Sequence, residues 1–158
     1  MDFGKLLLIG ALGSSLLVSG CGGGGGGGDG GDLQGFLSSE DWLLENEFYA
    51  DRYVFRATRT TTVDVDMDSP DFDPYLMVED EFGNVLEDDD SGPGDSAHIS
   101  FTVTEGREYE VRATSFDAFD TGDYDLVWSR GLRLEGELRS RGKDTEKLPG
   151  PKIRKKAG

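Results

Sequence analysis

The 158-residue sequence predicts an all-β fold: an antiparallel β-sandwich of jelly-roll-like type that forms a single domain over residues 33–130. Two observations predict it. Apolar and polar side chains alternate in short runs, as they do in strands with one buried and one exposed face. Turn-forming residues separate these runs. The alternating runs lie at 51–57, 63–67, 75–78, 99–103, 108–113 and 123–128.

Residues 1–20 have the features of a bacterial lipoprotein signal peptide. Lys5 precedes an apolar stretch at 6–18, which is too short for a membrane helix of about 18 or more apolar residues. The stretch ends in Val18-Ser19-Gly20-Cys21, which resembles the lipobox whose cysteine bacteria acylate. The alternative is a plain secretory signal with an incidental cysteine. We expect Cys21 to carry fatty acid and to anchor the protein to a membrane.

Residues 21–32 are expected to form the acylated cysteine and a flexible tether. Nine of the eleven residues from 22 to 32 are glycine. A chain of this composition has an r.m.s. reach of about 17–20 Å. The residue after the cysteine is Gly22. An aspartate at this position would favour retention in the inner membrane, so glycine favours the outer membrane. The expected location is therefore the bacterial cell envelope, at the outer membrane.

Charge separates the C-terminal end from the rest of the chain. The sequence has 32 acidic and 16 basic residues, whereas residues 130–158 carry a net charge of +6. We expect residues 131–158 to be a basic, largely disordered tail. Leu132, Leu134 and Leu138 alternate with charged residues, so a strand at the start of the tail is an open alternative.

The acidic remainder of the chain argues against nucleic acid as a partner. A single cysteine and a single histidine exclude an internal disulfide and a Cys/His zinc cluster.

Six short motifs follow one another between Gly35 and Trp128. They are Asp51-Arg52-Tyr53-Val54-Phe55, Ser69-Pro70-Asp71-Phe72-Asp73-Pro74-Tyr75-Leu76, Asp80-Glu81-Phe82-Gly83-Asn84-Val85-Leu86, Asp88-Asp89-Asp90, Gly106-Arg107-Glu108-Tyr109-Glu110-Val111 and Gly122-Asp123-Tyr124-Asp125-Leu126. In the order and spacing of these motifs, the region resembles the bacterial pre-peptidase C-terminal domain family. The resemblance implies a β-sandwich without catalytic residues, because this domain usually trails a secreted peptidase, and here no catalytic domain precedes it. It also implies calcium, collagen or other polymers as possible ligands. The family's usual glycine after the first motif is absent.

Acidic residues on both arms of one predicted hairpin suggest a calcium site. Pairing around the turn at 81–84 places Tyr75 opposite Asp90 and Met77 opposite Asp88. Close carboxylates repel each other unless a cation lies between them, and Ca²⁺ takes six to eight oxygen ligands. The alternative is an ordinary solvated acidic surface. The candidate calcium ligands are Asp71, Asp73, Asp88, Asp89 and Asp90.

Two aromatic residues are candidates for ligand contact. Phe116 and Phe119 flank Asp117 in a predicted loop, and exposed aromatic rings commonly bind polymers. The alternative is that they cap the core. An enzyme is not expected, because His98 is the sole histidine and no G-x-S-x-G motif is present.

The sequence therefore predicts a monomeric cell-envelope lipoprotein that presents a non-catalytic β-sandwich for binding or targeting and that calcium could stabilise. The expected ligand is an extracellular protein or polysaccharide. The alternative function is that of an accessory that assists a separate secreted peptidase. The sequence leaves the structure of residues 33–50 open, with either a helical turn or an edge strand at 38–44.

Overall fold

The structure, a computed structural model, describes residues 29–45, 47–138 and 150. The predicted signal peptide, Cys21, most of the glycine tether and nearly all of the basic tail beyond Leu138 lie outside the described residues. Within the described part of the chain, no helix has the length and apolar character that crossing a membrane requires.

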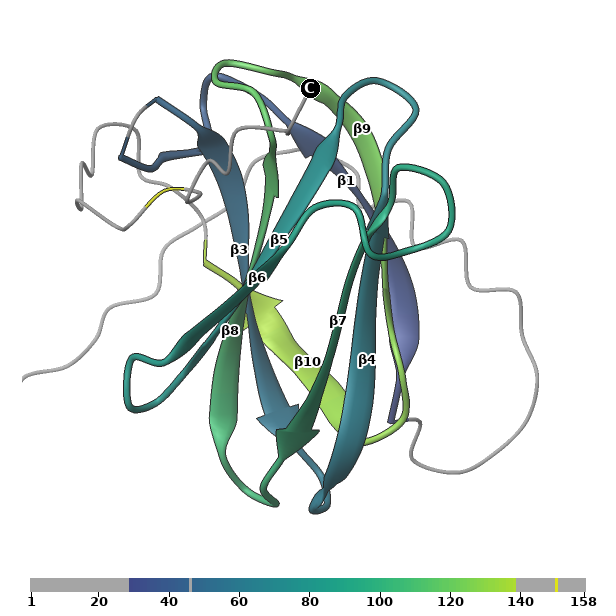
Figure 1. Cartoon of the computed structure of the whole chain (residues 1–158). Coiled ribbons are helices and arrows are strands. Elements are labelled where there is room, and N and C mark those ends of the chain that lie inside the picture. The colour runs from purple at the N-terminus through teal and green to yellow at the C-terminus, as the bar shows by residue number, and fades with distance from the viewer. Residues whose placement is uncertain (1–28, 46, 139–149, 151–158) are drawn as a thin grey trace, which may run out of the picture.

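The described residues form two antiparallel sheets that face each other, which confirms the predicted β-sandwich (Figure 1). Sheet A contains, in spatial order, β1 (Gly31–Leu37), β9 (Gly122–Trp128), β4 (Thr61–Asp68) and β7 (Ala97–Val103). Sheet B contains β10 (Leu132–Glu137), β3 (Tyr49–Ala57), β8 (Glu108–Ser115), β5 (Pro74–Asp80) and β6 (Val85–Asp88). The two-residue strand β2 (Trp42–Leu43) pairs with β3.

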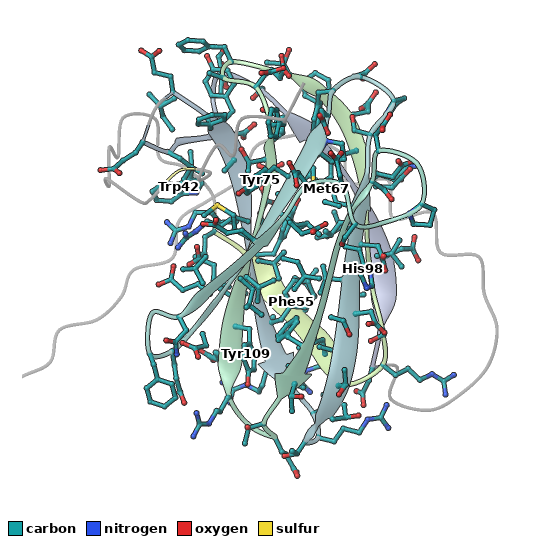
Figure 2. The ribbon with its side chains drawn as sticks, viewed as in Figure 1. Trp42, Phe55, Met67, Tyr75, His98 and Tyr109 are labelled. Carbon is teal, nitrogen blue, oxygen red and sulfur yellow. The ribbon has the colours of Figure 1, made fainter. Side chains whose placement is uncertain are left out.

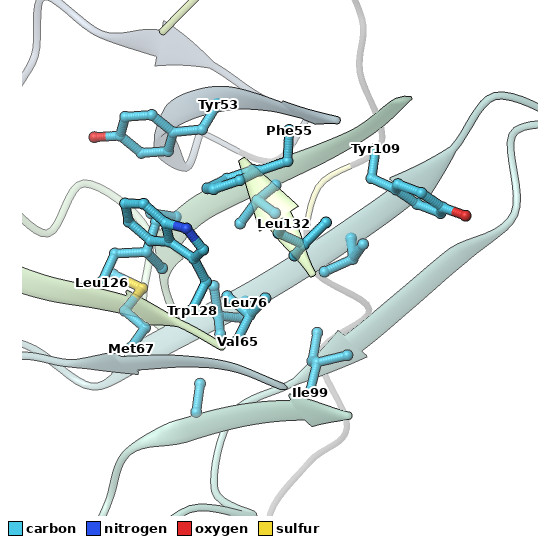
Figure 3. Packing of buried hydrophobic residues seen from close by; sticks show 14 of the residues in the cluster. Tyr53, Phe55, Val65, Met67, Leu76, Ile99, Tyr109, Leu126, Trp128 and Leu132 are labelled. Carbon is cyan, nitrogen blue, oxygen red and sulfur yellow. The ribbon is translucent and has the colours of Figure 1, made fainter. Parts of the chain in front are cut away.

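Alternate residues of both sheets fill the space between them (Figure 3). Phe55 and Trp128 come from opposite sheets and meet edge to face, with ring centroids 5.1 Å apart. Met67 and Leu126 are fully buried beside them. Each such side chain contributes roughly 1.5–3 kcal/mol by leaving water. The every-second-residue pattern of the sequence is therefore the pattern of the core.

The sandwich extends beyond the predicted limits of 33–130 at both ends. Strand β1 begins at Gly31, where a Cβ atom would lie 2.8 Å from Cζ2 of Trp128. The glycines of this segment are thus also packing residues, because they let the strand approach aromatic rings. At the other end, Leu132 of β10 is fully buried, so the start of the predicted tail is a strand of the domain.

A second, smaller cluster covers part of the outer face of sheet B (Figure 2). The open choice at 38–44 is settled in favour of a strand, since β2 pairs with the start of β3. The segment around β2 then lies over the sheet, with Trp42 packed against the cluster. The buried members of this cluster are Leu44, Phe48, Ala50, Tyr75 and Met77.

The predicted register of the β5–β6 hairpin is wrong by one residue. Met77 pairs with Glu87, and Asp88 pairs with Leu76. The loop has three residues, 81–83, because Gly83 adopts a left-handed conformation (φ 80°) and the N–H of Asp80 bonds to the carbonyl of Asn84 across the loop. A shift by one residue moves each side chain of the second arm to the other face of the sheet.

Candidate functional site

The predicted site residues lie at one end of the sandwich, which we call the loop end. It consists of the loops at 69–73, 89–96 and 116–121, and strand direction places all three at the same end (Figure 1). Their side chains, however, are engaged in different ways.

The five aspartates proposed as calcium ligands do not form one group. The Asp71 carboxylate accepts the N–H of Asp123 at the start of β9, with N···O 2.9 Å. The Asp88 carboxylate accepts the backbone N–H groups of Ser91 and His98, at 3.0 and 2.8 Å. Asp89 and Asp90 follow Asp88 in the loop toward β7. Among the residues that the structure describes, no three His, Cys, Asp or Glu side chains are grouped as a metal site requires.

The Asp88 carboxylate stabilises the start of β7 by binding backbone groups. It binds the N–H of His98 on the free edge of β7, and the Ser91 hydroxyl donates to the His98 carbonyl at 2.9 Å. An edge strand with uncovered backbone groups invites pairing with other chains. Asp88 and Ser91 therefore cover the beginning of an edge strand, a role that could not be foreseen from the sequence.

Asp71 and Asp73 line a surface pocket of about 450 Å³ instead. Asp68 and Asp95 contribute two further carboxylates to its wall. The pocket is thus acidic, and its carboxylates come from two segments, residues 68–73 and Asp95, rather than from the two arms of the β5–β6 hairpin.

His98 lies on the outer face of sheet A, on the opposite side of the sandwich from Trp42 (Figure 2). Its Nδ1 is 2.7 Å from the Asp66 carboxylate, and its Nε2 is 3.9 Å from that of Asp64. The hydrogen bond with Asp66 and the nearby charges of Asp64 and Asp88 raise the pKa of His98. Both ring nitrogens therefore face aspartates, an arrangement that stabilises imidazolium.

The two candidate aromatic residues have different environments. Phe116 is half buried and packs against the second cluster, with its ring 6.5 Å from that of Tyr75. Phe119 is 53 % exposed. Of the two, Phe119 is the residue that the loop end presents to solvent.

A buried polar cluster below the loop end was missed by the sequence analysis. The Tyr124 hydroxyl donates to the Asp51 carboxylate with O···O 2.6 Å, and the Tyr53 and Tyr124 hydroxyl oxygens are also 2.6 Å apart. All three residues are buried between the sheets. A signal was present, because Asp51 occupies the same inward phase of β3 as Tyr53 and Phe55.

A network of ion pairs lies on the outer face of sheet B, separate from the buried polar cluster. Arg112 is 1 % exposed, and its Nε donates to Glu110 at 2.7 Å while its Nη2 contacts Glu79. Arg52, directly opposite Arg112 in the ladder, holds Glu110 with two hydrogen bonds of 2.8 and 2.7 Å. Burial raises the pKa of Glu110, but the two arginines outweigh it and lower the pKa overall.

Together these features define a two-layered antiparallel β-sandwich domain with an acidic loop end. No family model matches the sequence, and no curated protein matches it. Among solved structures, the chain is similar to the pre-peptidase C-terminal domain of a collagenase from Bacillus anthracis, with 15 % sequence identity and a TM-score of 0.48 over 64 % of this chain and 90 % of that chain. The name of that domain is the name of the family whose sequence motifs residues 35–128 resemble. The fold itself stands on the strand pairing of this chain.

Proposed function

We propose that this protein is a non-catalytic binding module that a fatty-acyl group on Cys21 holds at the surface of a bacterial envelope. Its ligand is an extracellular polymer, either a polysaccharide or a protein such as collagen. The contact is made at the loop end through Phe119. The single observation that carries this proposal is the exposure of the Phe119 ring on a strained but tightly held backbone.

Phe119 has a left-handed backbone conformation (φ 65°), which costs a residue with a side chain of this size about 1–3 kcal/mol. Its N–H donates to the carbonyl of Glu47 at 3.1 Å, and Glu47 is itself left-handed (φ 74°). A backbone hydrogen bond thus joins the two residues with left-handed backbone conformations. Such strain concentrates at functional sites, and here it fixes an aromatic ring in solvent.

The Phe119 ring has an aromatic neighbour. It meets Tyr49 edge to face, with ring centroids 6.0 Å apart. Two adjacent aromatic side chains of low conformational entropy form a contact surface that suits the apolar face of a sugar ring or the side chains of an extended peptide.

Substitution of Phe119 by alanine is expected to weaken polymer binding by about thirtyfold, the effect of losing about 2 kcal/mol at a binding hot spot. The measurement is co-sedimentation of the purified full chain with insoluble chitin, peptidoglycan or collagen. Phe82→Ala is the matched control, because Phe82 is 67 % exposed at the opposite end, in the β5–β6 loop. Its binding should equal that of the wild type.

Equal losses in both variants, or no binding to any of the three polymers, would exclude this proposal. Co-purification with a secreted peptidase, unaffected by Phe119→Ala, would instead support the role of a peptidase accessory.

Calcium binding at the loop end stays a prediction from the sequence. Calcium at 100 times its dissociation constant would stabilise the fold by about 2.7 kcal/mol. Thermal unfolding of the full chain with and without millimolar calcium measures this. An increase in melting temperature that disappears in Asp71→Asn would support a site that includes the acidic pocket, and an unchanged melting temperature would remove calcium from the function.

A further inference from the structure

The buried cluster of Asp51, Tyr53 and Tyr124 joins the two sheets at the loop end. Asp51 and Tyr53 belong to β3 of sheet B, and Tyr124 belongs to β9 of sheet A. Since the single proton of the Tyr124 hydroxyl points to Asp51, Tyr53 must donate to Tyr124. The three residues therefore form one directed chain of hydrogen bonds that ends on Oδ2 of Asp51.

Strand β1 closes this cluster from the side. At Gly35 of β1, a Cβ atom would lie only 2.1 Å from Cζ and 2.3 Å from the hydroxyl oxygen of Tyr124. Among the strands that the structure describes, β1 is an edge strand of sheet A and pairs with β9 alone. Gly35 of β1 thus packs directly against the Tyr124 ring and hydroxyl.

Two further acidic groups face Asp51 from other elements. Asp41 comes from the turn that follows β1, where its carboxylate binds the N–H and hydroxyl of Ser38 at 2.6 and 2.9 Å. Glu137 comes from the end of β10, opposite Tyr53. Asp41 and Glu137 both raise the pKa of Asp51, in addition to the larger effect of burial, which the Tyr124 hydrogen bond opposes. From β1 itself, the cluster meets the uncharged Gly35.

We propose that Asp51, Tyr53 and Tyr124 form a proton-operated latch that fastens β1 and the turn after it to the sandwich. With Asp51 protonated, the cluster is neutral and β1 lies closed over Tyr124. Loss of the proton leaves a buried carboxylate facing Asp41 and Glu137. The repulsion acts directly on the turn that follows β1, and β1 opens locally while the rest of the sandwich stays folded.

The opening has a consequence for the anchored protein. Strand β1 is the first strand after the glycine-rich segment, so its release adds seven residues to the link between Cys21 and the domain. This consequence rests on the proposed anchor, whereas the latch itself does not.

Hydrogen exchange of the full chain, followed by mass spectrometry at pH 6 and pH 8.5 and corrected for intrinsic exchange rates, tests the latch. Protection of residues 31–41 in the wild type is expected to fall about tenfold between the two pH values, while that of β4 changes little. In Asp51→Asn the protection of 31–41 should be the same at both. Asp125→Asn, which removes an exposed carboxylate from the outer face of β9, should behave as the wild type.

Tyr124→Phe provides a second readout that a purely structural role would not produce. Removing the hydroxyl takes away the hydrogen bond that lowers the pKa of Asp51, so the pH midpoint of β1 opening should move upward. An unmoved midpoint, a pH effect that persists in Asp51→Asn, or loss of protection in all strands together would each overturn the latch. None of these measurements depends on a ligand, so the latch can fail while the binding function stands.

Discussion

Replacement of Asp51 by asparagine is expected to stabilise the protein at pH 8 by up to about 4 kcal/mol. Burial, the largest cause, raises the pKa of Asp51 in the folded protein from 3.8 to about 7. A group whose pKa is higher in the folded than in the unfolded chain stabilises the fold fully below the unfolded pKa. That stability is lost as the pH rises from about 4 through 7, and three pH units at about 1.4 kcal/mol each give the expected size.

Asparagine suits this position because it keeps the shape of the side chain without its charge. Its Oδ1 can accept the Tyr124 hydroxyl, and its amide can donate to the carboxylates of Asp41 or Glu137. Urea unfolding of wild type and variant between pH 4 and pH 8 measures the difference in unfolding free energy. The difference should be smallest at pH 4 and reach its maximum above pH 7.

The other titrating groups do not obscure this comparison. His98 also has a raised pKa, so its stabilisation too is lost as the pH rises. Its partners Asp64 and Asp66 are untouched by the substitution, and its contribution cancels between the two proteins. A stability difference that is the same at every pH would show that Asp51 titrates as an ordinary carboxyl group, contrary to our expectation.

The sequence predicted the strands whose two faces differ in polarity. The alternation around Tyr53 and Phe55 is a direct result of burying one face of β3, so it could be recognised without a structure. Strand β1 could not be recognised in this way. Its glycines at 31 and 35 are typical of a linker, and their packing against Trp128 and Tyr124 depends on residues that are far away in the sequence.

The candidate site shows the same division between local and long-range information. The sequence placed Phe116 and Phe119 in one loop, but their different exposure follows from contacts with Tyr75 and Glu47. The hairpin register failed at Gly83, where a left-handed residue shortens the loop and moves Asp88 away from its predicted partner. A charge in the buried phase, such as Asp51, is the one kind of long-range feature that an alternating pattern does reveal.

Replacement of Arg112 by alanine is expected to destabilise the protein by about 3 kcal/mol, because it removes a buried cation from two partly buried glutamates, Glu79 and Glu110. Glu110 keeps Arg52, which places the effect at the lower end of the range for broken buried ion pairs. Glu79 loses its contact with Arg112. The measurement is the free energy of urea unfolding at neutral pH.

Arg133→Ala is the matched control, because Arg133 is an arginine of the same sheet that bonds to a glutamate, Glu135, at 2.8 Å but is 59 % exposed. Exposed pairs of this kind contribute at most about 1 kcal/mol. Arg112→Met separates charge from packing, since methionine restores apolar contact beside Met77 without a cation for Glu79 and Glu110. If Arg112→Met is as stable as the wild type, the loss in Arg112→Ala comes from the vacated volume and the ionic account is wrong. If both variants lose stability and Arg133→Ala does not, the stabilisation depends on the buried charge of Arg112, and the outer face of sheet B around Arg112 contributes to the stability of the fold.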